Sequence, residues 1–111
     1  MSVRERMSTT SERSEAKRIG AKLHPNSGRG TIKGDMSTDL FVIDSKEYTK
    51  SFTISTDNWA KICSDTMSVS RSKSPMLYLV LNDNGRKTRL AVIEYSVLEE
   101  LLESVKNANN D

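Results

Sequence analysis

Leu40-Phe41-Val42-Ile43-Asp44-Ser45-Lys46 is the stretch that decides the fold of this chain. Its run of apolar residues is typical of a strand buried on both faces of a sheet, and the charged residues that follow indicate that the strand ends at an edge. Side chains two positions apart on a strand point to the same side, so Asp44 and Lys46 should project together, with Cα atoms roughly 6.6 Å apart. Charges placed so close to a core are costly unless a metal, a partner or a ligand compensates them.

Helices and further strands are expected on both sides of this strand. Before it, Ala16, Ile19 and Leu23 recur at helical spacing, in a helix that His24-Pro25 should end. Asp57 or a hydroxyl residue just before it should cap a middle helix, and Ser96 with Glu99 should form a capping box for the last one. The remaining expected features are an extended piece near Thr31–Met36, a short strand at Phe52–Ile54, the middle-helix stripe Trp59, Ile62, Cys63 and Thr66, a strand at Met76–Leu81, a hairpin turn at Asn84-Gly85, a returning strand at Leu90–Glu94, and the last-helix stripe Val97, Leu98, Leu101, Leu102 and Val105.

This order of elements, helix, three strands, helix, two strands, helix, predicts an α/β fold with a mixed sheet flanked by helices. A chain of 111 residues has room for one core, so we expect one domain over residues 9–106, with a flexible N-terminus (1–8) and a flexible tail (107–111). The longest apolar stretch, about six residues around Met76–Leu81, is far short of the roughly 20 that cross a bilayer. No signal peptide is indicated either, which predicts a soluble, cytoplasmic protein without a membrane partner.

Charge is distributed unevenly along the chain. Residues 1–34 hold eight Lys/Arg against three Glu, whereas the remainder holds nine Lys/Arg against twelve Asp/Glu. A basic segment beside a carboxylate-rich body suits an enzyme that draws in phosphates while acids hold a divalent cation. A solvated basic tail explains the same distribution, and charge alone leaves both interpretations open.

Three acids are candidates for a metal site. A turn within Ser37-Thr38-Asp39 would let hairpin pairing bring Asp35 beside Asp44, where a bound Mg²⁺ would relieve the repulsion between the two carboxylates. Lys46 could then orient the attacking water or offset charge on the transition state. Glu15 lies on the apolar face of the first helix and should look toward the sheet; Glu12 has a similar direction, so the choice between them depends on the helix register.

Several motifs in the stretch 12–94 together resemble phage-encoded Holliday junction resolvases of the PD-(D/E)XK nuclease superfamily. They are Ser27-Gly28-Arg29-Gly30, Lys33-Gly34-Asp35, Phe41-Val42-Ile43-Asp44-Ser45-Lys46 with Thr49, Ser51-Phe52-Thr53-Ile54, and Trp59-Ala60-Lys61-Ile62. The resemblance implies a restriction-endonuclease-like sheet, with Glu15, Asp35 and Asp44 as metal-site acids and Lys46 as the catalytic lysine. It also places Ser45 at the metal and Ser27, Gly28, Arg29 and Lys33 at the DNA. One departure is Asp44, because family members often carry glutamate there.

The function expected on this basis is cleavage of four-way (Holliday) junctions and related branched DNA by a Mg²⁺-dependent endonuclease, with Mn²⁺ as a possible substitute. Paired cuts by a chain with one site imply a homodimer, working in the host cytoplasm if the chain is phage-encoded. Two alternatives stay open. One is a nicking or restriction-like nuclease of the same fold, and the other is a non-catalytic DNA-binding protein.

Overall fold

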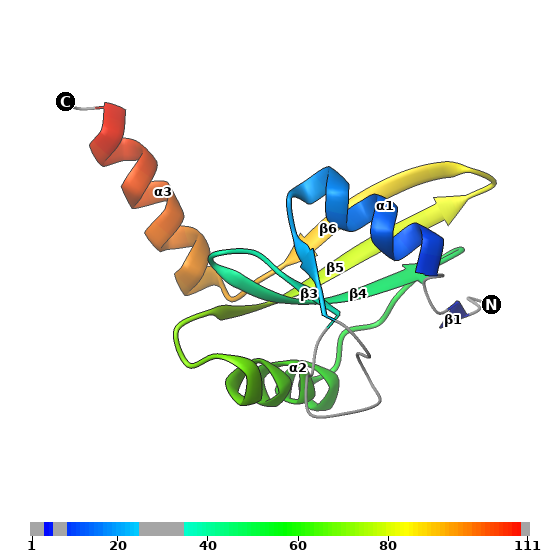
Figure 1. Ribbon diagram of the computed structural model, residues 1–111, viewed down its shortest axis with the longest axis horizontal. Helices are drawn as coiled ribbons and strands as arrows, with labels where there is room; N and C mark the ends of the chain where they lie inside the picture. Colours follow the sequence, from blue (N-terminus) through cyan, green and yellow to red (C-terminus); the bar gives the residue numbers. More distant parts are fainter. Residues whose placement is uncertain (1–3, 6–8, 25–34, 110–111) are drawn as a thin grey trace.

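The computed structural model describes residues 4–5, 9–24 and 35–109, which form one mixed sheet with helices packed on both sides (Figure 1). The elements are β1 (Arg4–Glu5), α1 (Thr9–Ile19), β2 (Lys22–Leu23), β3 (Met36–Ser37), β4 (Phe41–Tyr48), α2 (Thr56–Val69), β5 (Ser74–Asp83), β6 (Arg86–Val92) and α3 (Tyr95–Asn109). The predicted α/β class is therefore confirmed.

Strand β4 stands at the centre of the sheet, whose strands run in the order β2-β3-β4-β5-β6. It is parallel to β5 and antiparallel to β3, and the connection from β4 to β5 passes through α2. Helices α1 and α2 cover opposite faces of the sheet (Figure 1). Because side chains alternate along a strand, Ile43 and Ser45 point toward α1, and Asp44 and Lys46 point toward α2.

Both faces of β4 are buried, as its apolar run predicts. The α1 side holds a cluster of Ala16, Met36, Phe41, Ile43, Tyr78 and Val80. On the α2 side, Val42, Leu77 and Leu79 are each at most 5% exposed, and Ile62 of α2 is buried against that face. Each fully buried aliphatic side chain stabilises the fold by about 1.5–3 kcal/mol, so these two layers hold β4 and its charged residues in a fixed position.

Local signals explain where several elements begin and end. Ser55 caps α2. Its Oγ accepts a hydrogen bond from the Asn58 N–H, and the Asn58 Oδ1 accepts one from the Ser55 N–H. The predicted cap was Asp57 or a hydroxyl residue before it, and the hydroxyl alternative is correct. The turn at Asn84-Gly85 is also confirmed, with φ of 51° and 88°, the positive values that a two-residue hairpin of type I′ requires.

The order of elements from α1 to α3 agrees with the prediction, but the predicted end of the first helix and one predicted strand are wrong. Leu23 belongs to strand β2 and not to the first helix, because Gly20 adopts φ 71° and ends α1 one residue after Ile19. The segment Phe52–Ile54 forms no strand and leads irregularly into α2. The three strands between α1 and α2 are therefore β2, β3 and β4.

Helix α3 departs from the sequence prediction at both ends and projects from the body of the protein (Figure 1). It begins at Tyr95, so Ser96 lies inside the first turn and the predicted capping box is wrong. It continues through residues 107–109, which were predicted to be a flexible tail, just as β1 occupies part of the predicted flexible N-terminus. Val97 and Leu101 pack against the α1-side cluster, while Leu102 and Val105 are 56% and 58% exposed. None of the described helices is long and apolar enough to cross a membrane.

Candidate functional site

The candidate site lies where the pairing along one edge of β4 is interrupted. On the edge opposite β5, β3 pairs at Val42 and Ile43, and β1 pairs at Glu47 and Tyr48. Within the described part of the chain, no strand pairs with residues 44–46 on this edge. Backbone groups in such a gap need another partner, and a side chain supplies it.

Asp35 fills this gap. Its N–H donates to the carbonyl of Ile43 over 2.9 Å, which continues the β3 register and sets Asp35 opposite Asp44, as hairpin pairing predicts. Its carboxylate Oδ2 accepts both the N–H of Ser45 at 2.7 Å and the Ser45 hydroxyl at 3.0 Å. Ser45 therefore fixes the Asp35 carboxylate at the edge of the central strand.

Asp44 and Lys46 share the α2 side of β4, as their spacing predicts. The Lys46 Nζ lies 3.5 Å from Asp44 Oδ2, and each of the two side chains is 25% exposed. They line a cavity of about 270 Å³ together with Tyr48, Phe52, Asn58, Lys61 and Ile62. This pocket combines one acid and two lysines with an apolar wall contributed in part by α2.

The environment of Asp44 disfavours its negative charge. Burial raises the pKa of Asp44 to about 6; Lys46 opposes this increase, and the nearby Asp35 carboxyl reinforces it by repulsion and hydrogen bonding. A neighbouring carboxyl group that raises the pKa of Asp44 is an arrangement that a bound cation relieves. Asp35 and Asp44 supply hard oxygen ligands, and Mg²⁺ is commonly held by one or two carboxylates with water in its other positions.

Glu15 faces the sheet, as predicted, but does not join Asp35 and Asp44. Glu15 is 1% exposed, whereas Glu12 is half-buried, so Glu15 is the glutamate of α1 that points toward the sheet. Its Oε1 accepts the Tyr78 hydroxyl at 2.6 Å and the Arg89 Nε at 2.8 Å, and its Oε2 accepts Arg89 Nη2 at 3.0 Å. The hydrogen bonds from Arg89 lower the pKa of Glu15.

The structure does not bring the three predicted acids together. Glu15 binds its partners on the α1 side of the sheet, and Asp44 projects to the α2 side. Among the residues that the structure describes, no group of three or more His, Cys, Asp or Glu side chains is placed to hold a metal ion. Asp35 and Asp44 remain as the two candidate metal ligands. The hydroxyl of Ser45 orients Asp35, and a direct bond from Ser45 to a metal stays a prediction.

Tyr78 and Arg89 are polar partners that the sequence analysis missed. A signal for them exists in the hairpin turn, because Asn84-Gly85 sets the register in which Arg89 lies opposite Val80. Tyr78 is then two residues from Val80 on the same face, and a buried tyrosine hydroxyl needs a partner. Together they surround the inward carboxylate of Glu15.

The predicted DNA-binding residues Ser27, Gly28, Arg29 and Lys33 lie outside the described residues. The residues that flank this segment are described: the N–H of His24 donates to the carbonyl of Asp35 over 3.0 Å, and His24 Nε2 lies 3.0 Å from Ser37 Oγ. The two described residues that flank segment 25–34, His24 and Asp35, are therefore hydrogen-bonded to each other.

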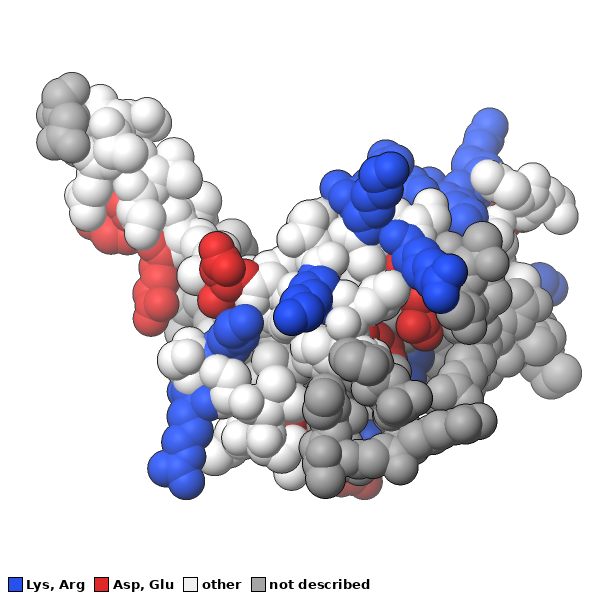
Figure 2. Space-filling view, viewed as in Figure 1, with Lys and Arg blue, Asp and Glu red and all other residues white. Residues whose placement is uncertain are grey.

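Two described basic residues of the first third lie away from the pocket of Asp44 and Lys46. Figure 2 shows Lys and Arg side chains over α1 and the β5–β6 hairpin, and Asp and Glu side chains over α3. Lys17 and Arg18 form the basic last turn of α1, on the face opposite to the pocket. The pocket itself has two lysines, Lys46 and Lys61.

Comparison with known proteins yields no relative: no family model matches the chain, and no curated protein or solved structure is significantly similar to it.

Proposed function

We propose that the chain is a Mg²⁺-dependent DNA endonuclease that hydrolyses phosphodiester bonds in branched DNA, with the four-way junction as its main substrate and a restriction-endonuclease-like sheet as its scaffold. The observation that carries the proposal is the group at the interrupted edge of β4: Asp35 fixed by Ser45, and Asp44 with Lys46 beside it. The raised pKa of Asp44 supports the proposal, because perturbed carboxyl groups in a pocket are typical of functional sites.

Asp35 and Asp44 are the residues that would hold the metal. Mg²⁺, or Mn²⁺ in its place, supplies positive charge for a phosphate oxygen and makes a coordinated water more acidic. The chain contributes the fixed geometry: Ser45 donates two hydrogen bonds to Asp35, so this carboxylate keeps its position when a substrate enters. Fixed ligands spare the reaction the cost of reorganising them.

Lys46 is the proposed catalytic lysine. Its side chain is 25% exposed and its Nζ lies 3.5 Å from Asp44 Oδ2, so it stands at the same pocket as Asp44. From that position it would orient an attacking water by hydrogen bonding or offset the negative charge that develops on the phosphate. A positive charge in a partly buried pocket acts more strongly than the same charge in water.

A second copy of the chain is the proposed partner, since a symmetric junction needs two cuts and each chain has one such pocket. The exposed stripe of α3 supports this pairing. Tyr95, Leu98, Leu102 and Val105 follow the alternating three- and four-residue steps of a coiled-coil seam, and Tyr95, Leu102 and Val105 are 70%, 56% and 58% exposed. The dimer would act in the host cytoplasm if the chain is phage-encoded.

One observation favours a second candidate, a DNA-binding protein without turnover. Glu15 is engaged by Arg89 and Tyr78, so Asp35 and Asp44 are the two candidate acids left to hold a metal. A site with fewer metal ligands binds a divalent ion more weakly, and this alternative predicts junction binding without cleavage.

Cleavage of labelled DNA tests the proposal. Purified protein is incubated with a four-way junction and with a linear duplex of the same arm sequences, each with Mg²⁺ and with a chelator. We expect Mg²⁺-dependent cuts in the junction and fewer in the duplex. Cuts in both substrates at equal rates would support the nicking or restriction-like alternative, and binding without any cut would support the non-catalytic one.

A further inference from the structure

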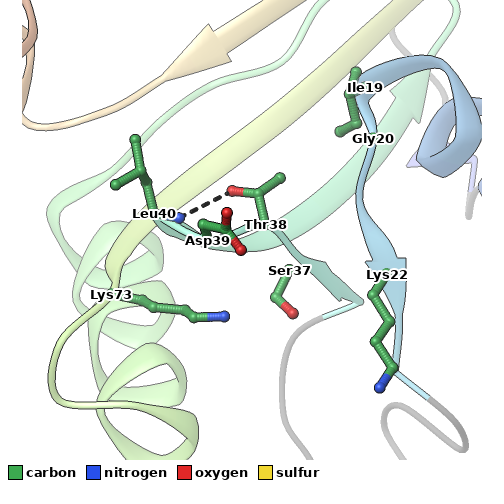
Figure 3. A pocket seen from close by; sticks show the side chains of 8 residues that line it. All are labelled: Ile19, Gly20, Lys22, Ser37, Thr38, Asp39, Leu40 and Lys73. Carbon is green, nitrogen blue, oxygen red and sulfur yellow. Dashed lines mark hydrogen bonds between the residues drawn. The ribbon is translucent and has the colours of Figure 1, made fainter.

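A second, more open cavity lies beside the candidate site and contains basic groups that the proposed chemistry does not use. Its volume is about 560 Å³, and Lys22 of β2, Ser37 of β3, and Lys73 from the segment before β5 are among its lining residues (Figure 3). Figure 3 shows the Ser37 hydroxyl between the side chains of the two lysines, which come from segments far apart in the sequence.

The strand register places this cavity on the same side of the sheet as the catalytic group. Lys22 pairs with Ser37, and Ser37 pairs with Val42, so these three side chains share one face. Val42 lies two residues before Asp44 on β4, which puts Asp44 on that face as well. Lys22 and Asp44 therefore lie on one side of the sheet, with the buried Val42 between them.

The charges of the cavity suit an anion. In the described part of the chain, neither Lys22 nor Lys73 takes part in a salt bridge, although Lys46 and Lys61 both do. Asp39 is the acid among the lining residues, so the two lysines leave an excess of one positive charge. The Thr38 hydroxyl accepts the N–H groups of Leu40 and Phe41, at 3.3 and 3.2 Å, and so holds the turn that forms one wall.

We propose that this cavity is a second phosphate subsite, in which Lys22 and Lys73 bind a backbone phosphate of the DNA strand that is cut at Asp35 and Asp44. This inference rests on the proposed function and adds a position to it. Two strand spacings and one two-residue step separate Lys22 from Asp44, a Cα distance of about 12 Å. The bound phosphate therefore lies a few nucleotides along the strand from the cleaved one.

The first test is the salt dependence of junction binding, measured with Ca²⁺ in place of Mg²⁺. Each neutralised phosphate contributes about 0.9 to the slope of log K against log salt, so Lys22→Ala/Lys73→Ala, which removes one phosphate contact, should lower the slope by about one. The control Arg86→Ala/Lys106→Ala removes the same charge from the exposed hairpin tip and from α3, and should leave the slope unchanged. Single-turnover cleavage at saturating protein should match wild type in both variants, because neither pair lines the pocket of Asp44.

The length of the substrate gives a second, independent readout. Shortening the duplex on one side of the cleavage position, so that it no longer reaches Lys22 and Lys73, should weaken binding by the wild type. The same shortening should not affect Lys22→Ala/Lys73→Ala, since the contact it removes is already absent. The subsite would be overturned if shortening weakened binding equally in wild type and variant, or if the salt slope of the variant were unchanged. Neither result would count against the proposed function, which is supported as long as the wild type cleaves the junction.

A wild-type protein that neither binds nor cuts DNA would overturn the proposed function. In that case, changes in the amide chemical shifts of the protein on addition of a ligand test whether the cavity binds phosphate groups. The probes are inorganic phosphate and a short single-stranded oligonucleotide. Shifts at Ser37, Thr38 and Leu40 with the oligonucleotide, lost in Lys22→Ala/Lys73→Ala, would support a polynucleotide subsite. Shifts with phosphate alone would show a site for the free ion, and no shifts would show no site; either result overturns the inference.

Discussion

Asp44→Asn should make the metal-free protein more stable at neutral pH, even though it removes a residue of the proposed active site. Burial and the neighbouring Asp35 raise the pKa of Asp44 from 3.8 to about 6 in the folded protein. A carboxyl group whose pKa is higher in the folded than in the unfolded state stabilises the fold below its unfolded pKa, and this advantage is lost as the pH rises through the folded pKa. At pH 7 the ionised group therefore opposes folding.

The size of the effect follows from the same two pKa values. One pKa unit is worth about 1.4 kcal/mol, so the interval from 3.8 to about 6 corresponds to about 3 kcal/mol at pH 7. At pH 4 most of the folded protein already carries a neutral Asp44, and the difference falls below about 1 kcal/mol. Asparagine keeps the shape of the neutral acid and avoids the charge, so the variant should gain about these amounts.

Urea unfolding at pH 4 and pH 7 in the presence of a chelator measures the free energy of unfolding of both proteins. Asp83→Asn is the matched control, because it removes a charge from an exposed position at the end of β5 and should change stability by less than about 0.5 kcal/mol. Saturating Mg²⁺ should stabilise the wild type and not Asp44→Asn. A variant that is less stable than wild type at pH 7, or that differs from it equally at both pH values, would refute the reasoning.

Four further predictions follow from the site and the surface. Asp35→Asn should fold and bind a junction but lose cleavage, whereas Asp35→Ala should also lose about 1–3 kcal/mol of stability because the Ser45 N–H is left without this acceptor; activity and urea unfolding distinguish the two. Arg89→Met should lower the urea midpoint at pH 7 by leaving Glu15 charged and buried, and the deficit should shrink as the pH falls below about 4.5, because Arg89 lowers the pKa of Glu15; an equal deficit at both pH values contradicts the pairing. Arg29→Ala should reduce the salt slope of DNA binding by about one, and an unchanged slope would make Arg29 a solvated surface residue. Sedimentation at micromolar concentration should give about twice the 12.5 kDa chain mass, and Leu102→Glu should give the monomer; a wild type that stays monomeric on a junction would favour a nicking enzyme.

The central strand and the Asp35–Asp44 pair could be predicted because their signals are local. Alternation along β4 fixes the common direction of Asp44 and Lys46, and a short turn fixes the residue opposite Asp44. Both inferences need no more than the spacing of residues within a few positions of one strand. The cap of α2 and the Asn84-Gly85 hairpin belong to the same class.

The position of Glu15 relative to the other acids could not be predicted in this way. Its inward direction follows from helical periodicity, but the face of the sheet that α1 covers depends on the path of the chain between elements. Similarly, the apolar stripe of α3 is visible in the sequence, yet periodicity does not show whether Leu102 packs in the core or stays exposed. A helical pattern identifies a face and does not identify what covers it.

The measurement that tests the central claim most directly is the single-turnover rate at which wild type and Asp44→Asn cut a labelled four-way junction in Mg²⁺. Glu15→Gln, whose site lies on the other face of the sheet, serves as the comparison variant at a temperature where all three proteins are folded. We expect cleavage by the wild type and by Glu15→Gln, and loss of cleavage in Asp44→Asn with binding retained. Cleavage by Asp44→Asn at the wild-type rate, or no Mg²⁺-dependent cleavage by the wild type, would contradict the account.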